Sequence, residues 1–270
     1  MQALPVLMYH HVSPNPGLVT VSPQVFREHM AWIAAHGYTT VGCDELAAFL
    51  AGAPLPKKSV VVTFDDGYLD NWVHAHPVLQ EFGQKAVLFL VTGWLGEGPV
   101  RPHAGEGGAV PDCPNHRRCK ELIGAGQGDA AMLRWSEVEA MRTAGTFEFH
   151  SHTHSHTRWD LQLPPGPERD QALAEDLAHS RATLAERLGG ASAHLCWPQG
   201  YYDETYIAIA RQAGFNYLHT TEKRLNTPGS DPLRIGRLVT KERPGRWLGS
   251  RLFIWRHSRL GSFYARLRGA

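Results

Sequence analysis

The chain has 270 residues, of which 43% are hydrophobic and 20% charged. Such a chain can bury a sizeable core, so a disordered or fibrous protein is excluded and one large domain of the size of an α/β barrel is expected. The formal net charge is +1, but ten of the 27 lysines and arginines lie from Arg234 onward, where Glu242 is the only acidic residue. The body of the chain is therefore mildly acidic and its end is basic.

Short apolar runs alternate with helical patterns along the chain. The expected strands cover residues 6–9, 60–64, 86–91, 147–149, 194–197 and 217–218, and the expected helices cover residues 22–36, 71–82, 168–188 and 204–213. Strands separated by helices of this length indicate βαβ units around a parallel sheet. The expected fold is α/β, a distorted (β/α) barrel with about seven parallel strands.

Capping residues predict where some helices begin. Ser22 before Pro23 predicts a helix start, and Gly37 predicts its end. Ser136-Glu-Val-Glu139 fits a capping box, with Gly145 ending that helix.

One segment interrupts the alternation of strands and helices. Residues 101–129 are rich in glycine and proline and show little apolar periodicity. A long segment without regular structure is usually an active-site loop or an insertion. We therefore expect one main domain over residues 1–245 with a loop insertion at 100–130, followed by a basic, aromatic segment over residues 246–270.

Two chemically rich segments each follow an expected strand. Thr63-Phe-Asp65-Asp66-Gly67 follows an apolar run, and His150-Ser-His-Thr-His-Ser-His156 follows residues 147–149. Catalytic groups of α/β barrels gather at the carboxyl ends of the strands. Adjacent carboxylates on a regular strand point to opposite faces, but Gly67 permits a turn that lets both approach one mouth in different roles.

A metal site is the chemistry that this pairing favours. His152 and His156 are four residues apart, a spacing that a helical turn brings together, and Asp66 would complete three protein ligands with a position left for water. Two imidazoles and one carboxylate suit an open, catalytic zinc site. Zinc would lower the pKa of bound water to roughly 7 and polarise a carbonyl oxygen, leaving Asp65 as the general base. Taken separately, the Asp-Asp-Gly motif also fits a simple turn and the histidine pair a surface feature.

These residues resemble the polysaccharide deacetylases, the NodB-homology family also called carbohydrate esterase family 4. Residues 63–67 match the family's Thr-Phe-Asp-Asp-Gly motif residue for residue, and residues 152–156 fit its His-Ser/Thr-x-x-His motif. The resemblance implies the first aspartate as base and a divalent metal, zinc above all, bound by the second aspartate and both histidines, that is, by Asp66, His152 and His156.

The histidine register is not unique. His150 and His154 have the same spacing as His152 and His156. We favour the later pair because relatives usually have Ser/Asn-His-Thr-x-Ser-His, which aligns with residues 151–156. The earlier pair is the alternative.

The third family motif, Arg-x-Pro-Tyr/Phe, is only partly present. Proline and a following glycine remain in residues 196–201, but Cys196 stands where the resemblance places the arginine that holds the base. Arg237 is a candidate substitute; its alternative is a simple surface charge. The resemblance also implies that a main-chain N–H of this loop helps to hold the oxyanion, and that the groove beside the metal is lined or supported by Trp197, Pro198 and Tyr201.

The family's late Leu-x-His motif, the source of the general acid, is not evident. Instead the first expected strand runs into Tyr9-His10-His11, which is similar to the Tyr-His start of the branch that deacetylates poly-N-acetylglucosamine. This resemblance implies that His10 protonates the leaving amine, a task that suits a side chain whose unperturbed pKa lies near physiological pH. A packed, structural His10 is the alternative, and His11 and His219 are weaker contenders.

The resemblance implies a catalytic domain that removes N-acetyl groups from amino sugars of a polysaccharide or its precursor. A metal-dependent amidase or deformylase acting on a small amide is one alternative. A catalytically silent glycan-binding module is another, because the arginine of the third motif is missing. An open groove would favour a glycan, and a closed one a small molecule.

Other features allow weaker predictions. In the insertion, Cys113, His116 and Cys119, with His103 upstream, could hold a second, structural zinc or none. Residues 247–260 mix aromatics with arginines, which suits either peripheral contact with anionic lipid or a helix packed on the barrel. No nucleic-acid motif is present, and no oligomeric state is predicted. The start of the chain lacks a secretory pattern, so we expect a cytoplasmic location, at the inner face of the membrane if the basic segment binds lipid.

Overall fold

The computed structural model describes residues 2–190 and 192–267. Within these ranges the strands are β1 (Val6–Tyr9), β2 (His11–Val12), β3 (Thr20–Val21), β4 (Thr39–Thr40), β5 (Ser59–Asp66), β6 (Ala86–Leu90), β7 (Phe147–Ser151), β8 (His194–Cys196), β9 (Tyr217–His219) and β10 (Leu238–Val239). The α-helices are α1 (Pro23–Ala35), α2 (Cys43–Leu50), α3 (His76–Glu81), α4 (His116–Gly124), α5 (Trp135–Thr143), α6 (Trp159–Gln162), α7 (Pro167–Leu188), α8 (Glu204–Gln212), α9 (Gly245–Trp255) and α10 (Ser258–Leu267).

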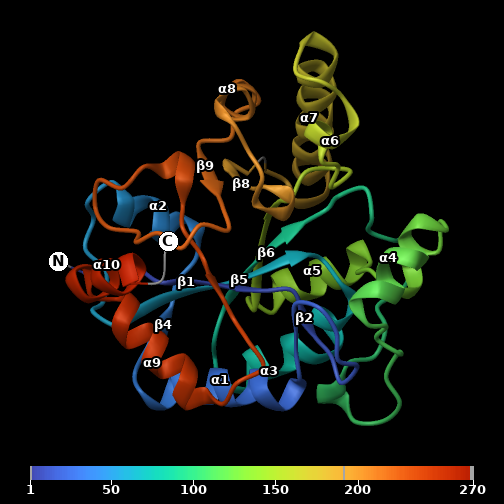
Figure 1. Cartoon of the computed structure of the whole chain (residues 1–270). Helices are drawn as coiled ribbons and strands as arrows, with labels where there is room; N and C mark the ends of the chain where they lie inside the picture. The colour runs from blue at the N-terminus through green and yellow to red at the C-terminus, as the bar shows by residue number, and fades with distance from the viewer. Residues whose placement is uncertain (1, 191, 268–270) are drawn as a thin grey trace.

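The main sheet is parallel and curls into a distorted barrel (Figure 1). Its strand order is β10-β1-β5-β6-β7-β8-β9, and β4 also pairs with β5. Beyond β9, Ile235 pairs with His219, and three residues later Leu238 pairs with Leu7 of β1. This stretch links the two edges of the sheet. The predicted (β/α) barrel with about seven parallel strands is confirmed.

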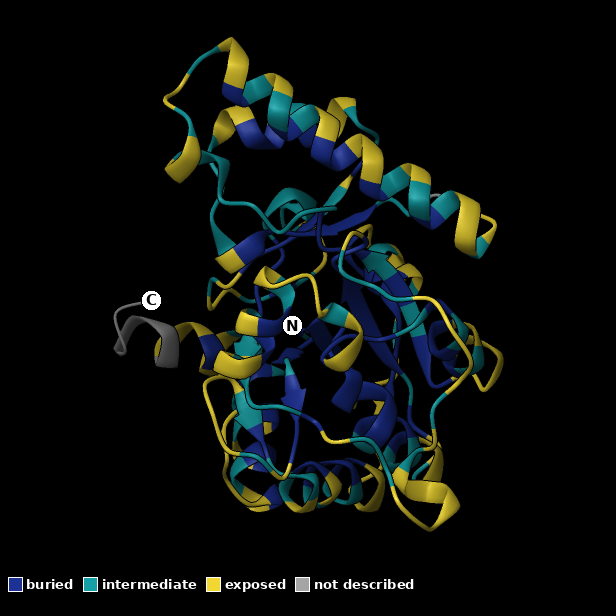
Figure 2. Ribbon diagram, turned by 90° about the vertical axis from the view of Figure 1, so that its right-hand side faces the viewer, coloured by how far each residue is buried: buried dark blue, intermediate teal, exposed yellow. Residues whose placement is uncertain are grey.

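Alternate strand residues form two separate cores, because successive side chains of a strand point to opposite faces. Leu7, Phe64 and Leu88 belong to an outer core shared with the surrounding helices. Val61 and Val87 belong to an inner cluster that also includes side chains of α2. Figure 2 shows the strands buried and the outer faces of the helices exposed. By the same alternation, every second residue of β5, ending with the first aspartate of the pair, faces the barrel interior.

Helix caps were predicted correctly at one helix and wrongly at another. The Ser22 hydroxyl accepts the N–H of Val25 at 3.2 Å at the start of α1, as expected. In α5, however, the cap is Arg134 and not Ser136: the Glu137 carboxylate accepts the N–H of Arg134 at 2.9 Å. The physical reason is that Arg101, from the insertion, holds the buried Glu137 carboxylate at 2.6 Å over the helix start.

The insertion contains more regular structure than its sequence predicts. It forms the nine-residue helix α4, in which the Asn115 side chain caps the start by accepting the N–H of Arg118 at 3.1 Å. Only Cys119 and Leu122 of this helix are buried. Since so few positions are apolar, the sequence shows no helical periodicity there.

The basic C-terminal segment begins as a packed helix. α9 lies against α1 (Figure 1), and Gly249 approaches the Trp32 ring so closely that any side chain would overlap it. Leu248 and Leu252 join the outer core, whereas Phe253 is exposed. No helix in residues 2–190 and 192–267 has the length and apolar character that a membrane span needs. Contact of this segment with a membrane surface stays a prediction.

Candidate metal centre and its base

The two aspartates part at the end of β5 through a left-handed turn. Asp66 has φ 75° and Gly67 has φ 87°. A non-glycine residue at positive φ is strained, and such strain is concentrated at functional sites. The turn allows both carboxylates to reach the mouth of the barrel while Asp65 keeps its inward strand orientation.

Asp66, His152 and His156 converge as the sequence predicts. The Asp66 Oδ1 atom lies 3.3 Å from the Nε2 atom of each histidine. This oxygen is buried and has no hydrogen-bond partner. Ligand atoms of a tetrahedral zinc are separated by roughly 3.3–3.5 Å, from Zn–N and Zn–O distances of about 2.0–2.2 Å. The orphaned oxygen and these spacings fit a divalent metal ion.

The histidine turn is not helical, contrary to the prediction. Thr153 has φ 68° and His156 has φ 58°, so a tight turn brings the two imidazoles together. Asp176 of α7 shapes this turn: its carboxylate accepts the N–H groups of His154 at 3.0 Å and Ser155 at 2.8 Å. Sequence reasoning missed Asp176, because nothing in its helix marks it as a partner of a loop about 20 residues earlier.

The orientation of His152 is set by the third motif. Its Nδ1 donates to the carbonyl oxygen of Cys196 at 2.8 Å, which directs Nε2 toward Asp66 as the nitrogen that a metal would take in place of a proton. Such a bond raises ligand basicity and fixes the ring. The main chain of Cys196 thus supports the site although its side chain departs from the family pattern.

The alternative register is not the one that the structure assembles. His150 Nδ1 lies 2.6 Å from the Ser192 hydroxyl, and its Nε2 lies 3.1 Å from the Glu148 carboxylate. His154 Nδ1 lies 3.0 Å from the Thr92 hydroxyl. Neither histidine belongs to the ligand group of Asp66.

Arg237 takes the place of the missing arginine beside Asp65. Its Nη1 and Nη2 atoms donate to Oδ1 at 2.7 Å and to Oδ2 at 2.8 Å. It is 1% exposed, so it is not a surface charge. Nη2 also lies 3.0 Å from Cys196 Sγ, so the guanidinium fills the space that the shorter cysteine leaves.

This pairing keeps Asp65 ionised. Burial raises the pKa of the Asp65 carboxyl, but the charge of Arg237, followed by those of His10 and His152, outweighs burial and holds that pKa below its usual value. Asp66 is also ionised: burial raises its pKa, yet the two histidines bring it well below the ordinary range.

His10 lies next to the base. Its Nε2 is 3.7 Å from Asp65 Oδ2, and 17% of its side chain is exposed, so it is accessible from the mouth. Burial lowers the pKa of His10 although both aspartates oppose this. His11 is instead paired with Asp70 at 2.6 Å and stacked on the Tyr68 ring at 3.8 Å, which gives it a packing role.

Further aromatic side chains, from the insertion and from the loops after β5 and β6, lie near the centre. His116 Nδ1 lies 3.2 Å from His11 Nε2 and 3.4 Å from the Tyr68 hydroxyl. The Trp94 ring lies 5.0 Å from the ring of His156. Tyr68 directly follows the Asp-Asp-Gly motif, and His116 was named only as a possible ligand of a second zinc, whereas Trp94 was missed.

Within the described residues, the prediction of a second zinc site in the insertion is wrong. The thiols of Cys113 and Cys119 lie against the carbonyl oxygens of Pro111 at 3.7 Å and Pro114 at 3.3 Å. Neither cysteine belongs to a convergent ligand group there.

The loop after β8 differs from the expected groove wall. Trp197 is 1% exposed and packs with Tyr206 in the core beside α8, and Pro198 is also buried. The Trp197 side chain is core because it continues the outward alternation of β8. Tyr201 is half-buried with the Arg158 guanidinium 4.3 Å from its ring centre.

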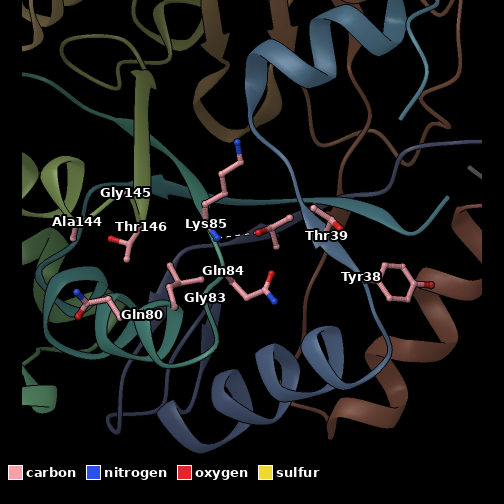
Figure 3. Close-up of a pocket in the computed structure, with 11 residues that line it drawn as sticks. Tyr38, Thr39, Gln80, Gly83, Gln84, Lys85, Ala144, Gly145 and Thr146 are labelled. Carbon is pink, nitrogen blue, oxygen red and sulfur yellow. Dashed lines mark hydrogen bonds between the residues drawn. The ribbon is translucent and has the colours of Figure 1, made fainter. Parts of the chain in front are cut away.

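A hollow of about 700 Å³ lies at the opposite end of the strands (Figure 3). Its walls include Thr40, Lys85 and Thr146, where the Lys85 N–H donates to the Thr40 hydroxyl at 2.9 Å. Lys85 and Thr146 precede β6 and β7, so this hollow is at their amino ends. Catalytic groups of such barrels lie at the carboxyl ends, so the hollow is not part of the centre.

A parallel barrel with an Asp-His-His group and a buried Asp-Arg pair at its strand ends defines the deacetylase class of (β/α) barrels. The chain belongs to the polysaccharide deacetylase family, whose model matches residues 52–218, more than half of the chain.

Individual relatives agree with this assignment. The putative polysaccharide deacetylase YxkH of Bacillus subtilis is 27% identical over 224 residues, which cover 81% of this chain and 64% of YxkH. The poly-beta-1,6-N-acetyl-D-glucosamine N-deacetylase of Staphylococcus aureus (strain N315) is 21% identical over 225 residues, covering 83% of this chain and 68% of the relative. The chain therefore spans about two thirds of the length of these relatives.

Solved structures share the fold. IcaB from Ammonifex degensii superimposes with a TM-score of 0.73 and 28% identity, covering 93% of this chain and 97% of that one. The Streptococcus pyogenes deacetylase PplD superimposes with a TM-score of 0.72 at 22% identity, covering 92% and 97%. The second likeness concerns the fold alone.

Proposed function

We propose that this protein hydrolyses the N-acetyl groups of amino sugars in a polysaccharide or its precursor, in a metal-dependent reaction. The observation that carries the proposal is the convergence of Asp66, His152 and His156 beside the Asp65–Arg237 pair at the barrel mouth. The name of the S. aureus relative supports a β-1,6-linked N-acetylglucosamine polymer as the substrate class.

Asp66, His152 and His156 would hold the metal, which we assign as zinc from the two-imidazole, one-carboxylate set. A metal in this position supplies a Lewis acid for the acetamide carbonyl and makes water nucleophilic at neutral pH. Asp66 contributes an ionised carboxylate, and the Cys196 carbonyl keeps His152 in the tautomer that presents Nε2.

Asp65 takes the proton of the attacking water. It is ionised, and the two-pronged contact with Arg237 holds its carboxylate in one orientation. His10 Nε2, 3.7 Å from Asp65 Oδ2, is placed to hand a proton to the departing nitrogen once it has taken one up, which the two aspartates favour and burial opposes. The products are acetate and a free amino sugar.

The silent glycan-binding alternative depended on the cysteine in place of the third-motif arginine. Arg237 contacts Asp65 from another part of the chain, and this contact supports an enzyme over a binding module. The N–H groups of Gly200 and Tyr201 donate to carbonyl oxygens of their own loop, so we assign the oxyanion role to neither.

The test is release of the acyl group from a panel of compounds: acetate from β-1,6-linked N-acetylglucosamine oligomers, β-1,4-linked oligomers and N-acetylglucosamine itself, and formate from a small formamide. We expect release from the β-1,6 oligomers that stops on chelation and returns with zinc. Release that chelation leaves undiminished would refute the metal mechanism. If only the small formamide is hydrolysed, the metal-dependent amidase is the better assignment. If none of the compounds is hydrolysed, the silent glycan-binding module is favoured.

A further inference from the structure

A second group of metal-ligand side chains lies inside the barrel, apart from Asp66 and its histidines. Cys43 at the start of α2, His194 of β8 and His219 of β9 each place a ligand atom within 4.8 Å of the others. All three residues are buried. The reaction described above uses none of them.

The sheet register explains why these residues meet. β8 and β9 pair in parallel, with His194 opposite Tyr217 and Cys196 opposite His219. Cys196 belongs to the inner cluster, so the alternation along β8 also turns His194 inward. Cys43 enters the same cluster from the start of α2.

The two imidazoles are close enough to share an ion. His194 Nδ1 lies 3.2 Å from His219 Nε2. Two nitrogens bound to one tetrahedral zinc are separated by about 3.3 Å. At the other centre, Asp66 Oδ1 is likewise 3.3 Å from the Nε2 atoms of His152 and His156, a separation that fits ligands of one zinc.

The other nitrogen of His219, which does not face His194, is unsatisfied. His219 is fully buried, and its Nδ1 has no hydrogen-bond partner. A buried nitrogen without a partner costs about 1–3 kcal/mol, so such atoms call for an ion, a water or a change of ring orientation. Aromatic rings on two sides limit the size of a ligand at this position: the ring centre of Phe89 lies 4.6 Å from that of His219, and the ring centre of Tyr217 lies 4.5 Å from that of His194.

A carboxylate lies beside the cysteine; burial and this carboxylate raise the pKa of the Cys43 thiol, so the ion itself would have to displace the thiol proton. The Glu148 carboxylate accepts the main-chain N–H of Cys43 at 2.5 Å and lies 3.1 Å from His150 Nε2. Gly42 permits this approach, since any side chain there would overlap the carboxylate. Glu148 and His150 also form a ligand group with Cys43, and since both His150 nitrogens already have partners, the Glu148 carboxylate is the candidate for a fourth position.

We propose that Cys43, His194 and His219 bind a second transition-metal ion of the zinc class, with Glu148 as the fourth ligand. A thiolate and two imidazoles suit zinc, and a fully protein-ligated, buried ion has a structural role. The ion ties α2 to β8 and β9. It lies beneath the Asp65–Arg237 pair, whose guanidinium is 5.7 Å from the Phe89 ring.

The first experiment counts metal in the purified full-length chain after zinc loading and removal of loosely bound ions. We expect two zinc ions per chain in the parent protein and one in Cys43→Ala. Asp66→Asn, which alters the other centre, also retains one, and the double variant retains none. Cys119→Ala is the matched control: it removes a buried thiol outside every ligand group found in the described part of the chain and keeps both ions.

Cobalt loading identifies the ligand. A thiolate on cobalt gives a charge-transfer absorption in the near ultraviolet, which we expect in the parent, in Asp66→Asn and in Cys196→Ala, but not in Cys43→Ala. The Cys196 variant matters because that thiol lies near Asp65 and His152. If Cys43→Ala does not fold, His219→Gln should lose the same single ion.

One zinc in the parent with no change in Cys43→Ala would overturn the proposal. Thiolate absorption that disappears in Cys196→Ala and persists in Cys43→Ala would also overturn it. A cobalt-loaded parent without thiolate absorption would overturn it too, and this last measurement does not depend on whether any variant folds. The inference does not rest on the proposed reaction. A parent that binds two ions but releases no acetate would sustain this site while removing the proposed function.

Discussion

Replacing Arg237 by methionine is the sharpest test of the catalytic centre, because the variant keeps a long side chain and removes one charge. Arg237 gives Asp65 two hydrogen bonds and also donates to the Thr220 carbonyl oxygen at 2.9 Å and the Thr63 hydroxyl at 3.2 Å. Breaking a buried ion pair by removing one partner typically costs about 3–5 kcal/mol. We expect a loss of that size in the free energy of unfolding at neutral pH.

The same change moves the pKa of Asp65. Burial raises this pKa and Arg237 is the largest influence that lowers it, so without the guanidinium burial prevails and the pKa rises. A protonated Asp65 cannot accept a proton from water. The acidic limb of the pH profile of kcat/KM should therefore move to higher pH, and a tenfold change in the proton affinity of Asp65 corresponds to about 1.4 kcal/mol.

Acetate release across pH and denaturant unfolding measure the two effects. Arg237→Lys keeps the charge without the two-pronged geometry, so its losses should be smaller. Arg234→Gln is the control: it breaks partly exposed ion pairs with Asp231 and Glu204. This should lower the free energy of unfolding by less than about 1 kcal/mol and leave the acidic limb of the pH profile unchanged. Cys196→Arg in the Arg237→Met background should restore part of the rate. An Arg237→Met protein with the parent's stability and an unmoved acidic limb would refute the reasoning.

The remaining predictions concern the metal, the histidine turn and acid stability. Asp65→Asn should retain its active-site metal and lose about 10²- to 10⁴-fold in kcat, whereas Asp66→Asn should lose both metal and activity. Asp176→Asn should weaken zinc affinity at that centre about 10- to 100-fold, because the turn carrying its histidines loses its anchor, while Glu175→Gln on the same helix should not. Burial lowers the pKa of His76 from 6.5 to about 4, so the unfolded chain binds a proton first as the pH falls. His76 should therefore lower the free energy of unfolding between about pH 6.5 and pH 4, and His76→Phe should flatten that dependence.

Metal analysis, zinc competition titration and denaturant unfolding at several pH values check these three predictions in turn. Metal loss in Asp65→Asn would reverse the assigned roles of the two aspartates. Equal zinc affinity in Asp176→Asn and Glu175→Gln would show that the turn is held without the Asp176 carboxylate. An acid dependence that is unchanged by His76→Phe would assign the effect to other buried histidines.

Much of the fold and of the metal centre was predictable because its information is local. The apolar runs marked the main strands, and residues 63–67 and 152–156 carry their ligands at the ends of two of them. Parallel strands bring their carboxyl ends to one edge, so local motifs on β5 and β7 had to meet there. The inferred shape of the histidine turn was wrong, because its geometry comes from Asp176 on α7 and not from a helical spacing.

The sequence by itself therefore determined the barrel, the family and the residues of the candidate metal centre, since each is encoded within a strand and the turn that follows it. The sequence offered Arg237, 172 positions from Asp65, as a candidate partner; only the tertiary structure decided that it pairs with this aspartate and is not a surface charge, and which cysteine lies beside His194 and His219. These contacts depend on sheet register and on how α2 packs, both of which are set by the cooperative burial of the whole inner face. No short segment of the chain contains that information.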